Sequence, residues 1–123
     1  MRDGPGEGIM PVCTVREKGD ITIAALPPNV DHVMAMTVEK ELRALALREP
    51  KALLLDCSGT TYMSSSGLRV LLIIAKMTRA AGTPFGVFSL SPFVDHIFSM
   101  SGFAKVISIY DTEDAAVRAV SRG

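Results

Sequence analysis

The chain has 123 residues, 48% of them hydrophobic, and its 13 basic and 13 acidic side chains cancel to a formal net charge of zero. This length suits one compact domain with a full hydrophobic core, and the composition excludes a disordered chain. The balanced charge argues against a nucleic-acid or anionic-membrane binder, because such proteins usually carry a basic surplus on one face. With two cysteines and two histidines, the chain is poorly equipped for a structural zinc site.

The first eleven residues are rich in glycine and proline and lack an apolar core, so they predict a flexible tail (1–11) rather than a signal peptide. Residues 12–123 are expected to form one domain. No apolar run reaches the roughly 20 residues of a membrane span, which predicts a soluble protein without membrane insertion. Cys13 and Cys57 fall in predicted strands without Cys-x-x-Cys spacing, and we expect buried, reduced thiols of a cytoplasmic protein.

The first predicted elements are two strands and a helix. Alternating apolar residues predict strands over Val12–Arg16 and Ile21–Leu26, joined by a glycine turn. Asp31 is placed to cap a helix from His32 to about Leu47. The expected buried side of this helix consists of Val33, Met36, Leu42, Leu45 and Ala46.

The continuous apolar run Ala52–Asp56 is typical of a central strand covered on both faces. The further elements predicted are a helix over Leu68–Ala81, a strand over Thr83–Leu90, a helix from Ser91-Pro92 to about Met100, a strand over Val106–Tyr110, and a helix over Glu113–Ser121 capped by Asp111 or Thr112. Helices that alternate with strands after an initial hairpin predict an α/β fold, with a mixed four- to five-stranded sheet and about four helices packed on it.

Three consecutive serines, Ser64 to Ser66, precede Gly67 at the point where the helix over 68–81 should begin. The first turn of a helix has free backbone N–H groups and a partial positive charge, so a hydroxyl there can cap the helix. It can equally carry a phosphate, which the helix end tolerates. With Ser64 as the cap, Ser66 falls in the first turn with its hydroxyl near the surface. A helix cap and a phosphorylation switch are therefore the two interpretations of this motif.

The segment from Asp56 to Leu68, DCSGTTYMSSSGL, resembles the signature of STAS domains, in particular that of the bacterial anti-sigma factor antagonists. The segment Leu90–Phe103 is similar to a second part of that family, in which Ser-Pro opens a helix that ends in Ser-Gly-Phe or Ser-Gly-Leu. The resemblance extends over roughly 12–120. It implies a single STAS-like domain that is a regulatory binding module and not an enzyme.

By this resemblance, Ser66 is the residue that a partner kinase, itself an anti-sigma factor, phosphorylates, and Ser65 is the adjacent alternative. The unphosphorylated antagonist would bind the kinase and free its sigma factor, phosphorylation would block that binding, and a serine phosphatase would restore it. The kinase supplies ATP and magnesium, so no cofactor or metal is expected for this chain, which should be a monomer or weak dimer. Ser64 stands where the family has an acidic residue. Without phosphorylation, the chain would serve as an interaction module in a scaffold or transporter-associated complex.

The partner surface is expected on this loop and on the start of the following helix. Its predicted residues are Asp56, Ser58, Tyr62, Ser64, Ser65, Ser66, Gly67, Leu68 and Arg69. Asp56 and Ser58 are expected to hold the base of the loop through hydrogen bonds to the backbone. Tyr62 and Met63 are expected to anchor the loop in the core, although an exposed Tyr62 would make a good partner contact. The helix over 68–81 is apolar over so much of its surface that it is either deeply buried or partly exposed as a docking face.

An enzyme interpretation was weighed against this binding role. Ser66, His96 and either Asp56 or Asp95 supply the residue types of a hydrolase triad, but the chain has no Gly-x-Ser-x-Gly turn. It also has no Gly-x-Gly-x-x-Gly motif and no phosphate-binding loop. We therefore expect no enzymatic activity and a structural role for His96. The methionines at positions 34, 36, 77 and 100 are expected to fill the core.

Overall fold

The computed structural model describes residues 11–121. Its elements, in chain order, are β1 (Thr14–Lys18), β2 (Ile21–Ala25), β3 (Asn29–Val30), α1 (His32–Leu47), β4 (Ala52–Asp56), β5 (Tyr62–Met63), α2 (Ser65–Ala81), β6 (Phe85–Phe88), α3 (Pro92–Ser101), a 3-10 turn (Phe103–Lys105), β7 (Ser108–Tyr110) and α4 (Glu113–Ser121). Apart from Pro11, the tail predicted over 1–11 lies outside the described residues. Within them, no helix is long and apolar enough to cross a membrane.

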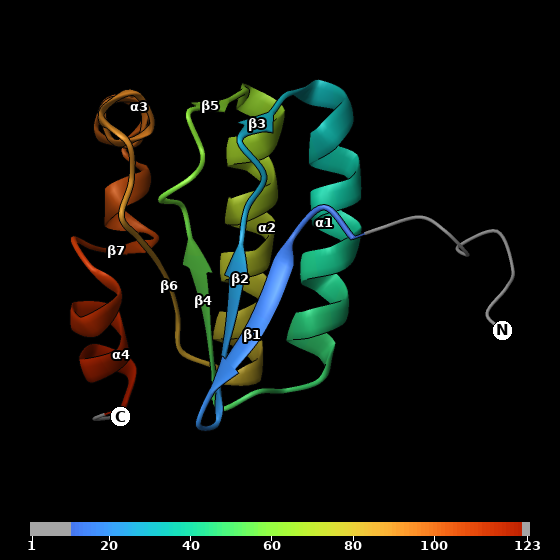
Figure 1. Ribbon diagram of the computed structural model, residues 1–123, viewed down its shortest axis with the longest axis vertical. Helices are drawn as coiled ribbons and strands as arrows, with labels where there is room; N and C mark the ends of the chain where they lie inside the picture. The colour runs from blue at the N-terminus through green and yellow to red at the C-terminus, as the bar shows by residue number, and fades with distance from the viewer. Residues whose placement is uncertain (1–10, 122–123) are drawn as a thin grey trace, which may run out of the picture.

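The main sheet has five strands in the order β1-β2-β4-β6-β7. β1 pairs antiparallel with β2 through the predicted hairpin, and the other pairs are parallel. Figure 1 shows α1 and α2 side by side against the sheet, with α3 and α4 toward the edge formed by β6 and β7. The predicted α/β class, with a mixed sheet and four helices, is therefore confirmed.

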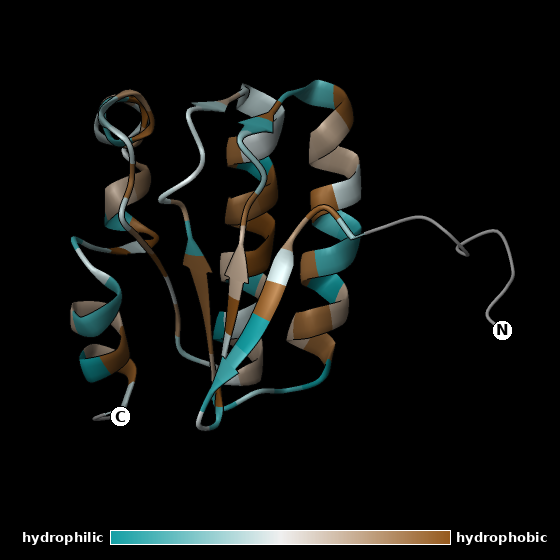
Figure 2. Ribbon diagram, in the orientation of Figure 1, coloured by the Kyte–Doolittle hydropathy of each residue, from teal (hydrophilic) through white to brown (hydrophobic). Residues whose placement is uncertain are grey.

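The central strand β4 divides the core into two layers. Leu53 and Leu55 point into the larger layer, which α1 and α2 cover, whereas Ala52 and Leu54 point into the smaller layer under α4. All four side chains are fully buried. Burial of a leucine side chain contributes roughly 1.5–3 kcal/mol, so this strand is a main source of stability. Figure 2 shows the corresponding run of hydrophobic residues along β4, as predicted for a strand covered on both faces.

Helix α1 buries only part of the predicted side, since Leu42, Leu45 and Ala46 are buried but Val33 and Met36 are not. Its buried residues are Ala35, Val38, Leu42, Leu45 and Ala46. Val33 and Met36 are 72% and 68% exposed, so their assignment to the buried side was wrong. Successive helical residues are about 100° apart around the axis. Met36 and Val33 therefore lie roughly 120° and 180° around the helix from the buried Leu42, which places them outside the core.

Smaller differences concern the ends of elements. β1 begins at Thr14, two residues later than predicted. Met100 is 74% exposed rather than a core residue, because α3 buries the opposite side of the helix through Val94 and Phe98. Of the two caps considered for α4, Thr112 is the one observed, since its Oγ1 accepts a backbone N–H at 3.1 Å.

A second, two-stranded sheet was not predicted. Asn29 pairs with Tyr62 and Val30 with Met63 in a parallel β3–β5 ladder. The backbone N–H of Ser64 continues this pairing by donating to the carbonyl of Val30 at 2.9 Å. The ladder lies immediately before α1 and α2 in the chain, so it brings the N-terminal ends of both helices together at one end of the molecule (Figure 1).

Candidate functional site

The N-terminus of α2 is capped as the serine motif predicts. Ser64 has extended backbone angles, and its Oγ accepts the backbone N–H of Gly67 at 3.2 Å. A serine in this position satisfies one of the free N–H groups of the first turn. Ser65 and Ser66 therefore lie within that turn, where Ser65 is exposed and Ser66 is half-buried.

Gly67 allows α2 to approach the β3–β5 ladder closely. A Cβ atom at this position would lie 2.7 Å from Cγ of Met63 and 2.9 Å from Cγ1 of Val30. Both neighbours are buried, so neither can move away easily. The glycine thus fixes the distance between the helix start and the ladder, and with it the position of the adjacent Ser66.

Ser66 contacts a histidine that the sequence did not single out. The Oγ atom of Ser66 lies 2.8 Å from Nδ1 of His32, the first residue of α1. Val30 and Met63 are paired in the ladder, and His32 and Ser66 follow them by two and three residues. The ladder register is therefore the reason that these two side chains meet. No sequence pattern indicates the contact, because it joins residues 34 positions apart.

A shallow pocket surrounds this contact between α1 and α2. It has a volume of about 140 Å³ and is lined by His32, Ala35, Met36, Glu39, Ser66, Arg69, Val70 and Ile73. Its walls are mostly apolar, and its charged groups are Glu39 and Arg69. Glu39 accepts a hydrogen bond from Arg43 at 2.8 Å on the same helix. Among residues 11–121, Arg69 forms no ion pair, so its guanidinium remains available beside Ser66.

The base of the loop before α2 is held by side-chain bonds, as predicted for Asp56. Its Oδ1 accepts the backbone N–H of Ser58 at 2.9 Å, and its Oδ2 lies 3.5 Å from a guanidinium nitrogen of Arg16. The buried Thr60 donates its hydroxyl to the carbonyl of Pro27 at 2.9 Å. These bonds orient the loop, and none of them involves Ser66.

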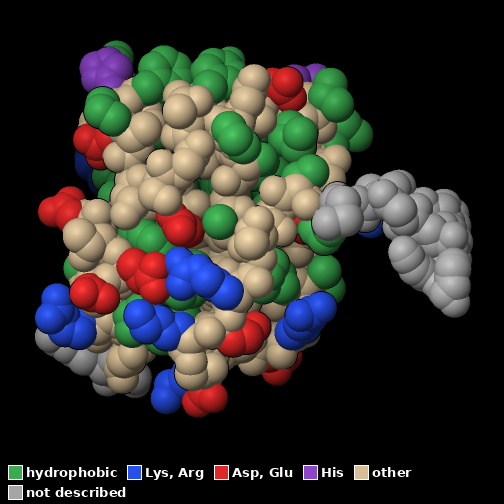
Figure 3. Space-filling view, viewed as in Figure 1, with side chains coloured by type: hydrophobic (Ala, Val, Ile, Leu, Met, Phe, Trp, Pro, Cys, Tyr) green, Lys and Arg blue, Asp and Glu red, His purple; other side chains and the backbone are tan. Residues whose placement is uncertain are grey.

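The Arg16 guanidinium also binds Glu113 at the start of α4. The two side chains form hydrogen bonds of 2.7 and 3.0 Å. Hydrogen bonding from Arg16, the largest cause, lowers the pKa of Glu113 to about 2, and Lys18 acts in the same direction. Figure 3 shows acidic and basic groups gathered on the lower half of the face in view. This ion-pair cluster is separate from the Ser66 pocket.

Two exposed aromatic residues extend the site toward α3. The rings of Tyr62 and Phe93 stack with centroids 5.7 Å apart and an interplanar angle of 24°. They are 42% and 46% exposed. Met63 anchors the loop in the core as expected, whereas Tyr62 takes the exposed alternative. Figure 3 shows hydrophobic side chains gathered along the upper edge, where Figure 1 places β3, β5 and α3. Aromatic residues of this kind are frequent anchors in protein interfaces.

The predicted partner residues therefore divide by exposure. Ser58, Tyr62, Ser65 and Arg69 are exposed, Asp56, Ser64 and Ser66 are half-buried, and Gly67 and Leu68 are buried. The buried pair shapes the site from within. Much of the apolar surface of α2 is likewise turned inward, through Leu68, Val70, Leu71 and Ile74. The sequence did not indicate His32 or Phe93 as site residues, because each is recognised only from the residue that it contacts in the folded chain.

The arrangement considered for a hydrolase triad is not formed within the described residues. Ser66 is bonded to His32 rather than to His96, which is exposed on α3. Asp56 is engaged with Ser58 and Arg16. In residues 11–121, no group of three or more histidine, cysteine or acidic side chains is placed to hold a metal ion.

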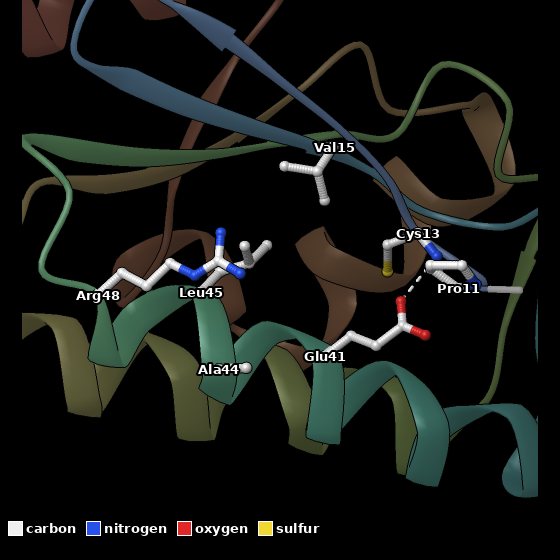
Figure 4. A pocket seen from close by; sticks show the side chains of 7 residues that line it. All are labelled: Pro11, Cys13, Val15, Glu41, Ala44, Leu45 and Arg48. Atoms are coloured by element: carbon white, nitrogen blue, oxygen red, sulfur yellow. Dashed lines mark hydrogen bonds between the residues drawn. The ribbon is translucent and has the colours of Figure 1, made fainter. Parts of the chain in front are cut away.

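A second pocket, of about 480 Å³, lies between β1 and α1. Figure 4 shows Glu41 reaching from α1 toward the start of β1, where its carboxylate accepts the backbone N–H groups of Val12 and Cys13, both at 2.9 Å. This contact ties the edge strand to the helix. Cys13 and Cys57 are buried free thiols, as predicted. Burial raises the pKa of both to about 12, so they are protonated at neutral pH.

Comparison with known proteins identifies the family. The model of the STAS domain matches residues 13–116. BtrV of Bordetella bronchiseptica, itself a candidate anti-sigma factor antagonist, is 33% identical over 97 residues, which cover 79% of this chain and 84% of that protein. The anti-sigma F factor antagonist of Paenibacillus polymyxa is 30% identical over 94 residues, covering 76% and 80% of the two chains.

Solved structures agree with these sequence relatives. The crystal structure of an anti-sigma factor antagonist from Mycobacterium paratuberculosis superposes with a TM-score of 0.80 at 26% identity, covering 89% of this chain and 92% of that one. The matched residues include the whole of the Ser66 pocket and the β3–β5 ladder. The chain therefore belongs to the STAS domain family, within which its named relatives are anti-sigma factor antagonists.

Proposed function

We propose that this chain is an anti-sigma factor antagonist that binds an anti-sigma factor with serine kinase activity and is released from it by phosphorylation of Ser66. One observation carries the proposal. The Ser66 hydroxyl lies in the first turn of α2, at the end of the molecule where Met36, Tyr62 and Phe93 are exposed. The family resemblance supplies the class of partner. We place the interaction in the cytoplasm, with the antagonist as a monomer or weak dimer.

The modification itself is a phosphoryl transfer from ATP that is held, with magnesium, by the partner kinase. The bond between the γ-phosphorus and the ADP oxygen breaks, a bond from Oγ of Ser66 to that phosphorus forms, and the hydroxyl proton leaves to a base or to solvent. A serine phosphatase restores the hydroxyl by transferring the phosphoryl group to water. This chain supplies the acceptor oxygen, and the kinase supplies the nucleotide site.

The fold should tolerate the phosphate. A phosphoserine adds about −1.5 to −2 units of charge at neutral pH. Ser66 lies at the positive end of the α2 dipole, and this helix has no acidic residue in its first turn. The Ser66 side chain is also outside both core clusters. Phosphorylation therefore alters the surface without opening the core.

The altered surface explains the loss of binding. A partner that covers the exposed Tyr62 and Phe93 rings together with the start of α2 would also cover Ser66. A partner that encloses the phosphate removes it from water, and taking an ion out of water costs several kcal/mol unless the partner matches its remaining negative charge. A loss of about 3 kcal/mol already lowers affinity more than 100-fold. The modification is thus sufficient for an on/off switch.

A second candidate is an interaction module that is not phosphorylated and serves a scaffold or a transporter-associated complex. The observation that favours it is Ser64, which stands where the family has an acidic residue and is here engaged as the helix cap. In this case the exposed aromatic pair would bind a partner permanently.

Intact-mass spectrometry of the protein from its native cells, with peptide mapping, tests the switch. We expect the mass of one phosphate, mapped to Ser66 and absent in Ser66→Ala, with Ser65→Ala as the matched control that retains it. The unmodified protein should capture a kinase-like anti-sigma factor, and the modified protein should not. A phosphate that maps to Ser65 would relocate the acceptor. No phosphate under any growth condition would reject the switch and favour the second candidate.

A further inference from the structure

The pocket beside Ser66 joins two helices rather than one. His32 is the first residue of α1, and Ser66 is the second residue of α2. Their side chains approach to 2.8 Å between Nδ1 and Oγ. A group attached to Oγ of Ser66 therefore begins within hydrogen-bond distance of a side chain on the neighbouring helix. The serine motif by itself predicts a single helix end, whereas the structure presents a two-helix site.

The charged groups around this contact favour an anion. Arg69 lies three residues after Ser66, on the same side of α2, and lines the same pocket. Its planar guanidinium can bind two phosphate oxygens at once. The nearby carboxylates have other partners, since Glu39 binds Arg43 and Asp31 accepts the backbone N–H of Met34 at 2.8 Å. Neither α1 nor α2 has an acidic residue in its first turn.

We propose that His32 and Arg69 receive the phosphate of phosphorylated Ser66, so that the modification closes a clamp between α1 and α2. In the unmodified protein, His32 is bonded to the Ser66 hydroxyl. After phosphorylation, the imidazole donates a hydrogen bond to a phosphate oxygen, and Arg69 binds the same group from the α2 side. This inference rests on the proposed function for the source of the phosphate, but the clamp itself needs only a phosphoserine at this position.

The clamp gives phosphorylation a second effect beyond adding charge. The phosphate would link the start of α1, where Val33 and Met36 are exposed, to the start of α2. Both sides of the pocket would then change together when the modification is added or removed. His32 acts here as a positioning residue for the phosphate and not as a catalytic one.

Phosphoserine inserted at position 66 during translation of the full chain tests the clamp without a kinase. The probe is the ³¹P NMR signal of that phosphate, followed through its second ionisation as pH is raised. Nearby positive charge stabilises the dianion, and the effect is small because solvent screens an exposed ionic contact. We therefore expect the titration midpoint in the wild-type sequence to lie about half a pH unit below that in His32→Asn, roughly a threefold change in the ionisation constant.

His96→Asn is the matched control, since the chain has only two histidines and the Ser66 hydroxyl is bonded to His32, whereas His96 is exposed on α3. It should leave the midpoint unchanged, whereas Arg69→Gln should raise it. In the His96→Asn background, the ring ¹⁵N signals report His32 alone, and the Nδ1 signal should shift between serine and phosphoserine at position 66. The clamp would be overturned if wild type and His32→Asn had the same phosphate midpoint. It would also be overturned if His96→Asn raised that midpoint as much as His32→Asn does. Absence of phosphate in native cells would instead overturn only the proposed function.

Discussion

Helices α2 and α3 begin with the same cap but differ in the rest of their first turns. Ser64 and Ser91 each accept a backbone N–H through Oγ, at 3.2 and 3.4 Å. α3 then carries its own carboxylate, Asp95, whereas α2 carries serines and no acidic residue. A negative charge near a helix N-terminus contributes about 0.3–1 kcal/mol. In the proposed switch, a phosphate on Ser66 would supply this stabilisation to the first turn of α2 after folding.

The surroundings of the two helix starts extend this difference. The start of α2 is fixed against the β3–β5 ladder by Gly67 and faces the start of α1 through His32. The start of α3 instead presents Phe93 at the surface, stacked on Tyr62. Under the proposed function, the start of α2 holds the modification and the start of α3 contacts the partner. Substitutions at the two starts should separate these roles.

The largest effect is expected for Gly67→Ala. The added methyl group would meet the buried side chains of Met63 and Val30 at less than 3.0 Å, and overpacking of this kind costs typically about 1–3 kcal/mol. Urea unfolding should show this loss, although alanine is the better helix former. Gly59→Ala is the control, because a Cβ atom there has no neighbour within 4 Å. A Gly67→Ala protein as stable as wild type would disprove the close-packing argument.

The two caps should then differ in strength. Ser64→Ala is expected to lower the free energy of unfolding by about 1 kcal/mol. Ser91→Ala should cost less, because its hydrogen bond is longer and Pro92 already sets the backbone of the first helical position. Thermal unfolding of the two variants, compared side by side, measures the difference. A larger loss of unfolding free energy in Ser91→Ala than in Ser64→Ala would show that Ser91 is the stronger cap.

The start of α4, which carries its own acidic residues, supplies a pH test. Arg16 lowers the pKa of Glu113 from 4.5 to about 2. A lowered carboxyl pKa contributes stability that is full above about pH 4.5 and is lost as the pH falls toward 2. Glu113→Gln should remove up to about 1 kcal/mol at neutral pH and flatten the stability curve over this interval.

Asp114→Asn is the matched change for Glu113→Gln, in the same turn and exposed, with no ion pair among residues 11–121. Both variants remove one negative charge from the first turn of α4, so the additional loss in Glu113→Gln measures the Arg16 contact. An identical acid branch in wild type and Glu113→Gln would show that the Arg16 contact does not stabilise the fold in solution.

The smallest effect is expected for Ser66→Glu, which places a permanent charge in the first turn of α2. Stability should rise by about 0.5 kcal/mol, measured by urea unfolding. Ser99→Glu makes the same change in the last turn of α3, where the helix dipole disfavours a negative charge, and should lower stability by a similar amount. If Ser66→Glu and Ser99→Glu lowered the free energy of unfolding equally, the helix dipole would not explain a difference between these two helix ends.

Much of the fold could be predicted from local chemistry. Ser64, Ser91 and Asp31 cap helices as expected, and the glycines at 82 and 102 end α2 and α3 in the left-handed conformation. The apolar run of β4 is buried on both faces. These features follow from residues that lie within one turn or one strand of each other, so the sequence contains all of the information that they need.

The predictions that failed depend on how elements are oriented. Val33 and Met36 were expected on the buried side of α1 with Leu42, but the helix is rotated so that Ala35 and Val38 face the core in their place. The two-residue strands β3 and β5 are too short to show any periodicity. Their pairing is decided by where the larger elements place the chain, which no local pattern encodes.

The candidate site combines both kinds of information. By itself, the sequence determined the family, the position of the Ser66 turn and the capping role of Ser64, because a motif of adjacent residues carries them. Only the tertiary structure decided that His32, 34 residues earlier in the chain, contacts Ser66, and that Phe93 stacks on Tyr62. The physical reason is the parallel β3–β5 ladder and the packing of α3 beside it, which join segments whose sequences contain no sign of one another.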